Sequence, residues 1–265
     1  MADDTSPIRQ ATDRPMGILD QPNEDRALMV SLNGDVYARH PVRTHLVTEA
    51  DDAAAVVARY AQPLGPDLVL VAVSERMVAI TQGRSYPMVH IHPGRLARFL
   101  VRFVTRPGYG IGLGTAETLQ LAINEVGAPR ILLAAMVSGI TKPFGVHGLF
   151  YRVAGPQAAA IDGPTSYTIP PYNQAATLGP RNPNGASRQI AAAIGAPVAI
   201  IDANDAGCNP LGISPGVDRR FVSRLFADNP LGQASEQTPI CVVRRVPWPP
   251  SDPLPPEPRA RLTPP

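Results

Sequence analysis

Hydrophobic residues recur at helical spacing in four segments of this chain. In Asp51 to Tyr60 and in His92 to Val104 the apolar positions follow a period of three to four residues, and the second segment carries a row of arginines on another face. The third segment, Thr115 to Val126, begins at a capping residue and ends before a glycine. Ser187 to Ile194 is the fourth segment and also ends before a glycine. We therefore predict a helix in each of these segments.

Short runs of aliphatic and β-branched residues lie between these segments and predict strands. Asp67 to Val73 and Val78 to Thr81 are divided by the polar residues Ser74 to Arg76, which indicates a strand, a turn or bulge, and a second strand. Three further runs predict buried strands, and these are Ile131 to Val137, Val198 to Ile201 and Ile240 to Val243. This order predicts an α+β fold with mixed or antiparallel sheets and flanking helices.

The two ends of the chain lack such patterns. Residues 1–26 mix Asp, Arg, Pro and Asn without an apolar period, so we expect a flexible arm with no catalytic role. Residues 246–265 contain nine prolines in twenty positions, which favours extended polyproline geometry. We expect the catalytic domain to span residues 27–245. The proline-rich tail is then either draped over the surface or weakly docked in an aromatic groove of a partner.

Composition argues against several classes of function. The 265 residues include 24 basic and 22 acidic side chains, an excess too small for the many phosphate contacts of a nucleic-acid-binding protein. The apolar runs are shorter than the roughly 20 residues that a membrane span requires. The two cysteines lie far apart without a metal-binding motif, and we expect no leader segment and a location in the reducing cytoplasm.

The strongest candidate for chemistry is VAIIDANDAG, a buried strand that ends in Asp202, Asn204 and Asp205. Carboxylate and amide oxygens on a rigid strand end suit Mg²⁺ or Mn²⁺, which in turn bridges nucleotide phosphates. An Asx-rich turn that hydrogen-bonds its own backbone explains the same residues equally well. Asp162 follows another aliphatic run and would bring a second carboxylate to the same ion, although alone it predicts a turn.

Cationic and titratable residues gather in the segment TKPFGVHGLFYRVAG, which contains Lys142, His147 and Arg152. The glycines among them would let a ligand approach closely, so these three residues are candidate catalytic residues. For His147 the main alternative is a hydrogen-bonded structural role, which is the commoner fate of a lone histidine.

Two loops are weaker candidates for binding. GYGIGLG leads into the Thr115 helix and suits either a phosphate cradle or a tight backbone connection. DNPLGQASEQT precedes the last strand and presents Asn229, Gln233 and Glu236. These polar groups suit a metal, a base edge or a ligand amide, and ordinary loop polarity is the alternative.

The order of these segments resembles the ligases that add L-glutamate to coenzyme F-420, the γ-glutamyl ligase family, and above all their ligase-like relatives of unassigned substrate. The matching pieces run from about Pro41 to Arg244, and they are VRTHLVTEADD, VLVAVSERMVAITQGR, GIGLGTAETLQLAINEVGAPRILLAA, ITKPFGVHGLFYRVAG, AAIDGP, AIIDANDAG and DNPLGQASEQTPICVVR. The resemblance implies an intertwined homodimer of an α+β fold that uses GTP and a divalent metal to form an acyl phosphate.

The resemblance also assigns residues to roles. The metal ligands would be Asp162 and Asp202, which we extend to Asp205. The residues around the nucleotide would be Arg43, Thr44, Ser74, Arg76, Arg84 and Gln233. The chain departs from the family at Ala79 and Ile80, where the family has a Ser-Lys pair, and at Ala203, where the ligases have threonine.

These observations predict a cytoplasmic ligase that depends on a metal and a nucleotide. It would use GTP or ATP with Mg²⁺ or Mn²⁺ to join glutamate or a similar amino acid to a small carboxylate-bearing molecule. It would be a homodimer without a nucleic-acid or membrane partner. A non-catalytic nucleotide- or metabolite-binding protein on the same scaffold is the main alternative, and a purely structural homodimer is the third.

Overall fold

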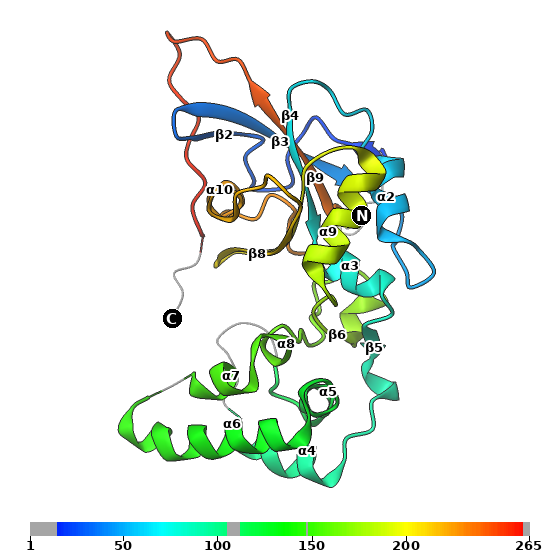
Figure 1. The fold of residues 1–265 in the computed structure, drawn as a ribbon, viewed down its shortest axis with the longest axis vertical. Coiled ribbons are helices and arrows are strands. Elements are labelled where there is room, and N and C mark those ends of the chain that lie inside the picture. Colours follow the sequence, from blue (N-terminus) through cyan, green and yellow to red (C-terminus); the bar gives the residue numbers. More distant parts are fainter. Residues whose placement is uncertain (1–14, 105–111, 147, 262–265) are drawn as a thin grey trace, which may run out of the picture. The chain divides into compact units, whose positions relative to one another are not determined.

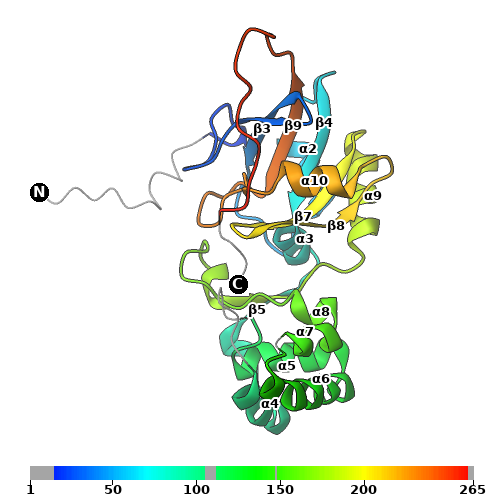
Figure 2. The same cartoon turned by 90° about the vertical axis from the view of Figure 1, so that its left-hand side faces the viewer.

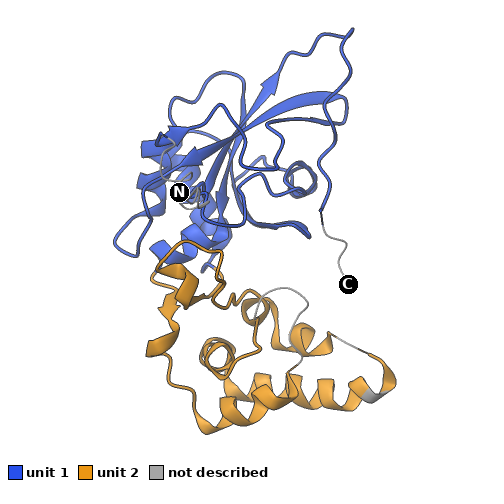
Figure 3. Cartoon of the chain, turned by 180° about the vertical axis from the view of Figure 1, so that it is seen from behind, with its two compact units in different colours: residues 1–82, 180–265 blue, residues 83–179 orange. Residues whose placement is uncertain are grey.

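The structure is a computed structural model that describes residues 15–104, 112–146 and 148–261. The chain forms two compact units, which are coloured separately in Figure 3. Unit 1 consists of residues 1–82 and 180–265, and unit 2 consists of residues 83–179. Unit 2 is thus inserted into the sequence of unit 1.

Unit 1 is built on a mixed sheet with the strand order β1-β3-β9-β4-β7-β8, in which β2 also pairs with β3 (Figure 1). The described strands of this sheet are β1 (Gly17–Ile18), β2 (Met29–Leu32), β3 (Asp35–Arg43), β4 (Leu68–Ser74), β7 (Val198–Asn204), β8 (Gly207–Ile213) and β9 (Ile240–Val246). β4 and β7 are parallel, whereas β9 lies between β3 and β4 and is antiparallel to both. Strands β3, β4 and β7 therefore run in the same direction.

Helices cover the sheet of unit 1 on both faces. They are α2 (Ala53–Tyr60), α3 (Glu75–Thr81), α9 (Pro183–Ile194) and α10 (Arg219–Leu225), and Figure 2 shows α10 lying against the sheet. Leu70 and Ala72 of β4 pack into one core with Phe226, which follows α10. Val71 and Val73 point to the opposite face of the strand and are also fully buried. Burial on both faces explains the continuous apolar runs of the central strands.

Unit 2 is mainly helical and has a hydrophobic core of its own. Its helices are η1 (Met88–His90), α4 (Arg95–Leu100), η2 (Val101–Phe103), α5 (Ala116–Val126), α6 (Ala128–Thr141), η3 (Lys142–Phe144), α7 (Leu149–Ala154), α8 (Pro156–Ala159) and η4 (Tyr172–Gln174). Strands β5 (Ser85–Pro87) and β6 (Ala175–Thr177) form a separate antiparallel pair. The core includes Leu119, Ile131 and Phe150, which come from three different helices.

The predicted fold class is confirmed at the level of a mixed α+β fold with a mixed sheet and flanking helices. Most predicted elements are also present. The Thr115 helix is α5, whose cap is the Thr115 side chain and which ends at Gly127. The predicted strands at Val198 and Ile240 are β7 and β9. The segment from His92 contains two short helices, α4 and η2, in place of one long helix.

Two predicted strands are wrong, because both segments are helical. Val78 to Thr81 belongs to α3, so the segment after β4 is a helix and the predicted strand pair does not form. Ile131 to Val137 lies inside α6. α3 buries four successive residues, and α6 is apolar on its exposed side as well as on its buried side, so neither run shows a helical period. Length alone does not separate a strand from a helix. The Leu, Ala and Met residues of α6 favour the helix.

The described part of the N-terminal segment is bound to unit 1. β1 pairs with the end of β3, and the Leu19 backbone N–H donates to the Pro41 carbonyl oxygen at 2.9 Å. The proline-rich tail runs along β2, where the backbone N–H of Ser31 donates to the Pro256 oxygen at 3.2 Å. The Ser31 hydroxyl donates to the Pro255 oxygen at 2.6 Å. The tail is therefore draped over unit 1 up to its last described residues.

No described helix, taken singly, has the length and apolar composition to cross a membrane. Helices α5 and α6 reach the required length and composition only as a pair, and this pair is bent by 119°.

Candidate functional site

The carboxyl ends of β3, β4 and β7 meet at one edge of the sheet in unit 1. Val42 of β3 pairs with Ile240 of β9, and Ile240 pairs in turn with Val73 of β4. The next residue of β4, Ser74, pairs with Ile201 of β7. The residues that follow these positions are therefore brought to the same edge, and they are Arg43, Thr44, Ser74 and Asp202. In open α/β sheets, ligands bind just beyond the carboxyl ends of strands that run in the same direction.

The loop that enters β9 lies between two of these strand ends. The Thr44 backbone N–H donates to the Gln237 oxygen at 3.2 Å, and the Ser74 N–H donates to the Pro239 oxygen at 2.8 Å. Thr44 is almost fully buried, and its hydroxyl donates to the His45 carbonyl oxygen at 2.8 Å. Ser74 is the N-cap residue of α3, and its side chain makes no capping hydrogen bond. Arg43 is buried and Arg76 is half-buried in α3.

Residues 228–238, which we call the 228–238 loop, are anchored by a buried arginine. Arg39 of β3 is fully buried and forms an ion pair with Asp228, with one guanidinium nitrogen 2.8 Å from Oδ2. The same guanidinium donates to the Leu225 oxygen at 2.8 Å and to the Ala27 oxygen at 2.8 Å. This one side chain thus holds the start of the loop, the end of α10 and the N-terminal segment together.

Two asparagines fix the middle of the 228–238 loop. Asn229 is fully buried at a positive φ of 50°, and its Nδ2 donates to the Gly232 oxygen at 2.9 Å. Asn23 is also buried, and its Nδ2 donates to the Pro230 oxygen at 3.0 Å and to Thr238 Oγ1 at 2.8 Å. The loop is therefore built with specific polar contacts from the N-terminal segment.

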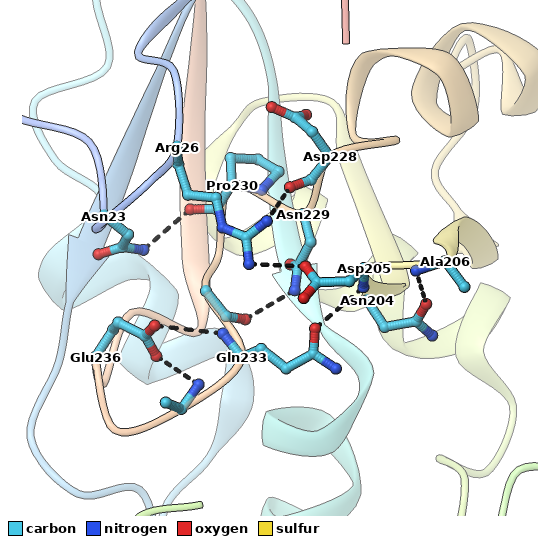
Figure 4. Close-up of polar contacts among 12 residues, drawn as sticks. Asn23, Arg26, Asn204, Asp205, Ala206, Asp228, Asn229, Pro230, Gln233 and Glu236 are labelled. Carbon is cyan, nitrogen blue, oxygen red and sulfur yellow. Dashed lines mark hydrogen bonds and ion pairs between the residues drawn. The ribbon is translucent and has the colours of Figure 1, made fainter. Parts of the chain in front are cut away.

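Asp205 lies at the centre of a polar cluster, which is drawn in Figure 4. Its carboxylate forms an ion pair with Arg26 at 2.8 Å, and its backbone N–H donates to Gln233 Oε1 at 3.0 Å. Its backbone oxygen accepts from the Arg261 N–H at 2.8 Å. We call Asp205, Arg26, Gln233 and Arg261 the Asp205 cluster. Three distant parts of the sequence converge there on the turn between β7 and β8.

The turn itself is an Asx turn. Asn204 Oδ1 accepts from the Ala206 backbone N–H at 2.9 Å, as Figure 4 shows. This is the alternative that the sequence leaves open for Asn204. β7 also extends through Asp202 to Asn204, so the strand does not stop at Asp202 as the sequence indicates.

Within the described residues, no three His, Cys, Asp or Glu side chains are close enough together to hold a metal ion. The carboxylates at the end of β7 belong to Asp202 and Asp205, which are both half-buried, and Asp205 is paired with Arg26. Mg²⁺ needs only one or two carboxylates when phosphates and water complete its shell. Within the described residues, Asp202 and Asp205 could therefore contribute one or two ligands to such an ion, but they do not form a complete metal site.

No family model matches this chain, and no curated protein does. The resemblance to the γ-glutamyl ligases therefore stays a prediction.

The other residues assigned from the sequence lie in unit 2. Asp162 is exposed and forms an isolated backbone bridge with Thr177. Arg84 is buried, forms an ion pair with Glu125 at 2.7 Å and donates from Nε to the Gly179 oxygen at 2.7 Å. The structure thus divides the assigned residues between the units. Unit 1 contains Arg43, Thr44, Ser74, Arg76, Asp202, Asp205 and Gln233, and unit 2 contains Arg84, Lys142, Arg152 and Asp162.

Two of the sequence candidates fall wholly or partly outside the described residues. His147 lies outside them, as do Gly108 and Gly110 of the GYGIGLG segment. The described end of that segment includes Gly112 at a positive φ of 47° and leads into the capped start of α5.

A hydrogen-bonded chain beside Arg43 and Thr44 was missed by the sequence analysis. His45 Nε2 lies 3.0 Å from Asp51 Oδ1, and His45 Nδ1 lies 3.0 Å from the Tyr60 hydroxyl. The backbone N–H of Thr48 donates to Asp51, and together with His45 it lowers the pKa of that carboxyl below its usual range. The short spacing of His45 and Asp51 in VRTHLVTEADD is the feature of the sequence that could have indicated this chain. The sequence pattern there predicts only the start of a helix.

Burial disfavours the thiolate form of both cysteines. Burial raises the pKa of Cys241 to about 12. Burial, with the Asp202 carboxylate nearby, raises the pKa of Cys208 well above its usual range. The thiolate is the form that attacks carbonyl groups and binds metals, so these raised pKa values argue against such roles for the two cysteines.

Proposed function

We propose that this protein is a nucleotide- and metal-dependent ligase that joins an amino acid, such as glutamate, to a small carboxylate-bearing molecule. The observation that carries the proposal is the sheet edge at which β3, β4 and β7 end. Cationic, hydroxyl and carboxylate side chains lie in the last residues of these strands or just after them, and the anchored 228–238 loop lies between two of the strands. Phosphoryl transfer needs this combination of rigid positioning and charge neutralisation.

In this proposal, the chain's own residues bind and orient the phosphates. Arg43 and Arg76 contribute positive charge, and the Ser74 hydroxyl is a donor for a phosphate oxygen. Gln233 is held in place by the Asp205 backbone N–H. Asp202 supplies an oxygen ligand for Mg²⁺, which neutralises phosphate charge when bound.

The proposed reaction has two steps. An oxygen of the acid attacks the γ-phosphorus, the bond to the β-phosphate oxygen breaks, and an acyl phosphate and a nucleoside diphosphate form. The neutral amine of the amino acid then attacks the acyl carbon, inorganic phosphate leaves with the electron pair of its C–O bond, and the amine loses a proton to solvent. The roles of Lys142, Arg152, Arg84 and Asp162 in this reaction stay predictions from the resemblance.

The test is nucleotide hydrolysis that depends on added substrates. The full chain is incubated with GTP or ATP, Mn²⁺ or Mg²⁺, and a panel of amino acids and small acids, and released phosphate is measured. We expect release only when an acid and an amine are both present, and at least a hundredfold lower release for Asp202→Asn. Asp252→Asn in the exposed tail is the matched control and should retain full activity. Activity that survives in Asp202→Asn would contradict the proposal.

A second candidate is a non-catalytic nucleotide-binding protein. It is favoured by the ion pair of Asp205 with Arg26 and by the hydrogen bond of Asn204 within its own turn, because both side chains then have a structural role. Saturable nucleotide binding with no phosphate release for any substrate pair would select this candidate.

We also propose a location in the cytoplasm, because both cysteines are free, which suits a reducing compartment.

The predicted homodimer is supported by an exposed apolar face on α6. Leu132, Leu133, Met136 and Ile140 lie at helical spacing and are 43% to 66% exposed. Exposed apolar surface of this kind marks an interaction site. Light scattering should give twice the chain mass for the wild type and the chain mass for the double variant Leu133→Glu, Ile140→Glu. Gln157→Glu on α8 should stay dimeric, and a monomeric wild type would contradict the assembly.

A further inference from the structure

Unit 2 contains a pocket of its own, with a volume of about 660 Å³. It lies between the α4–η2 segment and α6, and its apolar part includes Leu100, Ala135 and Phe150. Leu100 and Phe150 belong to the hydrophobic core of unit 2, so the pocket floor is fixed by packing. Its volume is in the range of about 300–1,000 Å³ that small-molecule sites occupy.

The polar part of the pocket is cationic. Arg102, Lys142 and the hydroxyl-bearing Ser138 line it, and no acidic residue is among the described residues that line it. Lys142 Nζ donates to the Phe103 oxygen at 3.0 Å, which positions the ammonium group at the pocket. An ammonium group has three N–H donors, so two remain for a ligand. The whole of unit 2 has eight basic and three acidic residues, which gives an anionic ligand a favourable surrounding charge.

Exposed apolar side chains line or adjoin the pocket. Phe103 lines the pocket, is exposed, and packs against the ring of Phe99 at a centroid distance of 5.4 Å. Ile140 follows the lining residue Gly139 on α6 and is exposed. A highly charged sugar phosphate would leave this surface in water, whereas a ligand with an apolar body would cover it.

We propose that this pocket binds a small amphiphilic carboxylate. Its apolar body lies against Leu100 and Phe150, and its carboxylate is bound by Lys142 and Arg102, since guanidinium and carboxylate groups match in geometry and charge. Binding rests on unit 2 alone. The identification of this ligand with the acid that the ligase consumes rests, in addition, on the proposed function.

The experiment measures binding without nucleotide or metal. The full chain is titrated by calorimetry with hexanoate, octanoate and decanoate below their micelle-forming concentrations, and with 1-decanol as a neutral analogue. We expect one site per chain and an affinity that rises roughly fourfold for each methylene that is buried. 1-Decanol should bind at least tenfold more weakly than decanoate, because it offers the two cations no negative charge.

Two variants and a control locate the site. Gly139 lines the pocket and a Cβ there would meet nothing within 4 Å, so we expect Gly139→Phe to be tolerated, to occupy pocket space and to lower decanoate affinity more than tenfold. Lys142→Gln should weaken decanoate about tenfold and leave 1-decanol unchanged. Arg95→Gln is the matched control, because Arg95 is exposed on α4 and does not line the pocket.

Three outcomes would overturn the inference. One is decanoate binding that Gly139→Phe leaves intact, and another is an equal loss in Lys142→Gln and Arg95→Gln. The third is a wild-type dimer that dissociates when decanoate is added, since a second copy of the chain would then be the natural occupant of the pocket. Because nucleotide is absent, failure of the ligase proposal leaves all of these results unchanged, and the two claims are tested separately.

Discussion

At the scale of single residues, the candidate site depends on side chains buried next to it. Arg39 is the clearest case, because its charge is fully buried and one carboxylate, Asp228, balances it. No sequence pattern marked Arg39, which lies in a strand whose other residues are mostly apolar. Its partner Asp228 lies 189 positions away, and an ion pair at such a separation is invisible without the fold.

Asp228→Ala should destabilise the protein by about 3–5 kcal/mol, because it leaves a buried arginine without a counter-charge. Urea unfolding followed by circular dichroism measures this loss. Asp67→Ala is the control, since Asp67 pairs with Arg244 at 3.5 Å near the surface and should cost less than about 1 kcal/mol. Equal losses in the two variants would show that burial of Arg39 has no special energetic role.

We expect Asp51 to make the stability of unit 1 depend on pH in the acid range. Its pKa is lowered in the folded state, first by the Thr48 backbone N–H and then by His45, so its contribution is present above the unfolded value of about 3.9. The contribution is lost as the pH falls through the lower, folded pKa. Asp51→Asn should therefore flatten the pH dependence of the urea midpoint below about pH 4. A slope identical to the wild type would show that Asp51 titrates normally.

At the scale of elements, capping residues and periodicity predicted much of the fold. α5, β7 and β9 were located by a cap, a glycine stop and apolar runs, all of which are local signals. α3 and α6 were predicted as strands because four successive residues of α3 are buried and α6 is apolar on nearly every side. Tertiary packing decides whether such a segment forms a helix or a strand, and a local sequence pattern carries no information about that packing.

The N-cap residue of α5, Thr115, offers a direct test of one of these local signals. Thr115 Oγ1 accepts from the Thr118 N–H at 3.2 Å, and Thr118 Oγ1 accepts from the Thr115 N–H at 3.3 Å. Thr115→Ala should cost about 1 kcal/mol in thermal or urea unfolding, and Thr115→Ser should restore most of it. A serine variant no better than alanine would indicate that the methyl group of Thr115, and not its hydroxyl, matters.

At the scale of the whole molecule, the candidate site is only partly visible in the sequence. The sequence named the residues of unit 1 that we propose for metal and nucleotide binding, and the sheet topology brings three of them, Arg43, Ser74 and Asp202, to one edge. The Asp205 cluster was not foreseen, because Arg26 and Arg261 come from the two segments that lacked any apolar pattern. These segments reach Asp205 only in the folded structure, where the pairing of the strands between them brings them close together.

The tail should therefore behave as part of the fold. Trp248 is the protein's single tryptophan and is half-buried in this segment, so its fluorescence reports on the tail alone. Acrylamide should quench it several-fold less in the native protein than in urea-unfolded protein. Equal quenching in both states would mean that the tail is free in solution, and that its contacts with Ser31 and Asp205 do not persist.

The central claim is that the edge formed by the ends of β3, β4 and β7 binds a nucleotide with Mg²⁺. The most direct measurement is a calorimetric titration of the full chain with GTP and with ATP, in the presence and absence of Mg²⁺, for the wild type and Asp202→Asn. We predict one Mg²⁺-dependent nucleotide site per chain, weakened at least tenfold in Asp202→Asn and unchanged in Asp252→Asn. No binding by the wild type, or binding that is equal in the wild type and Asp202→Asn, would contradict this claim.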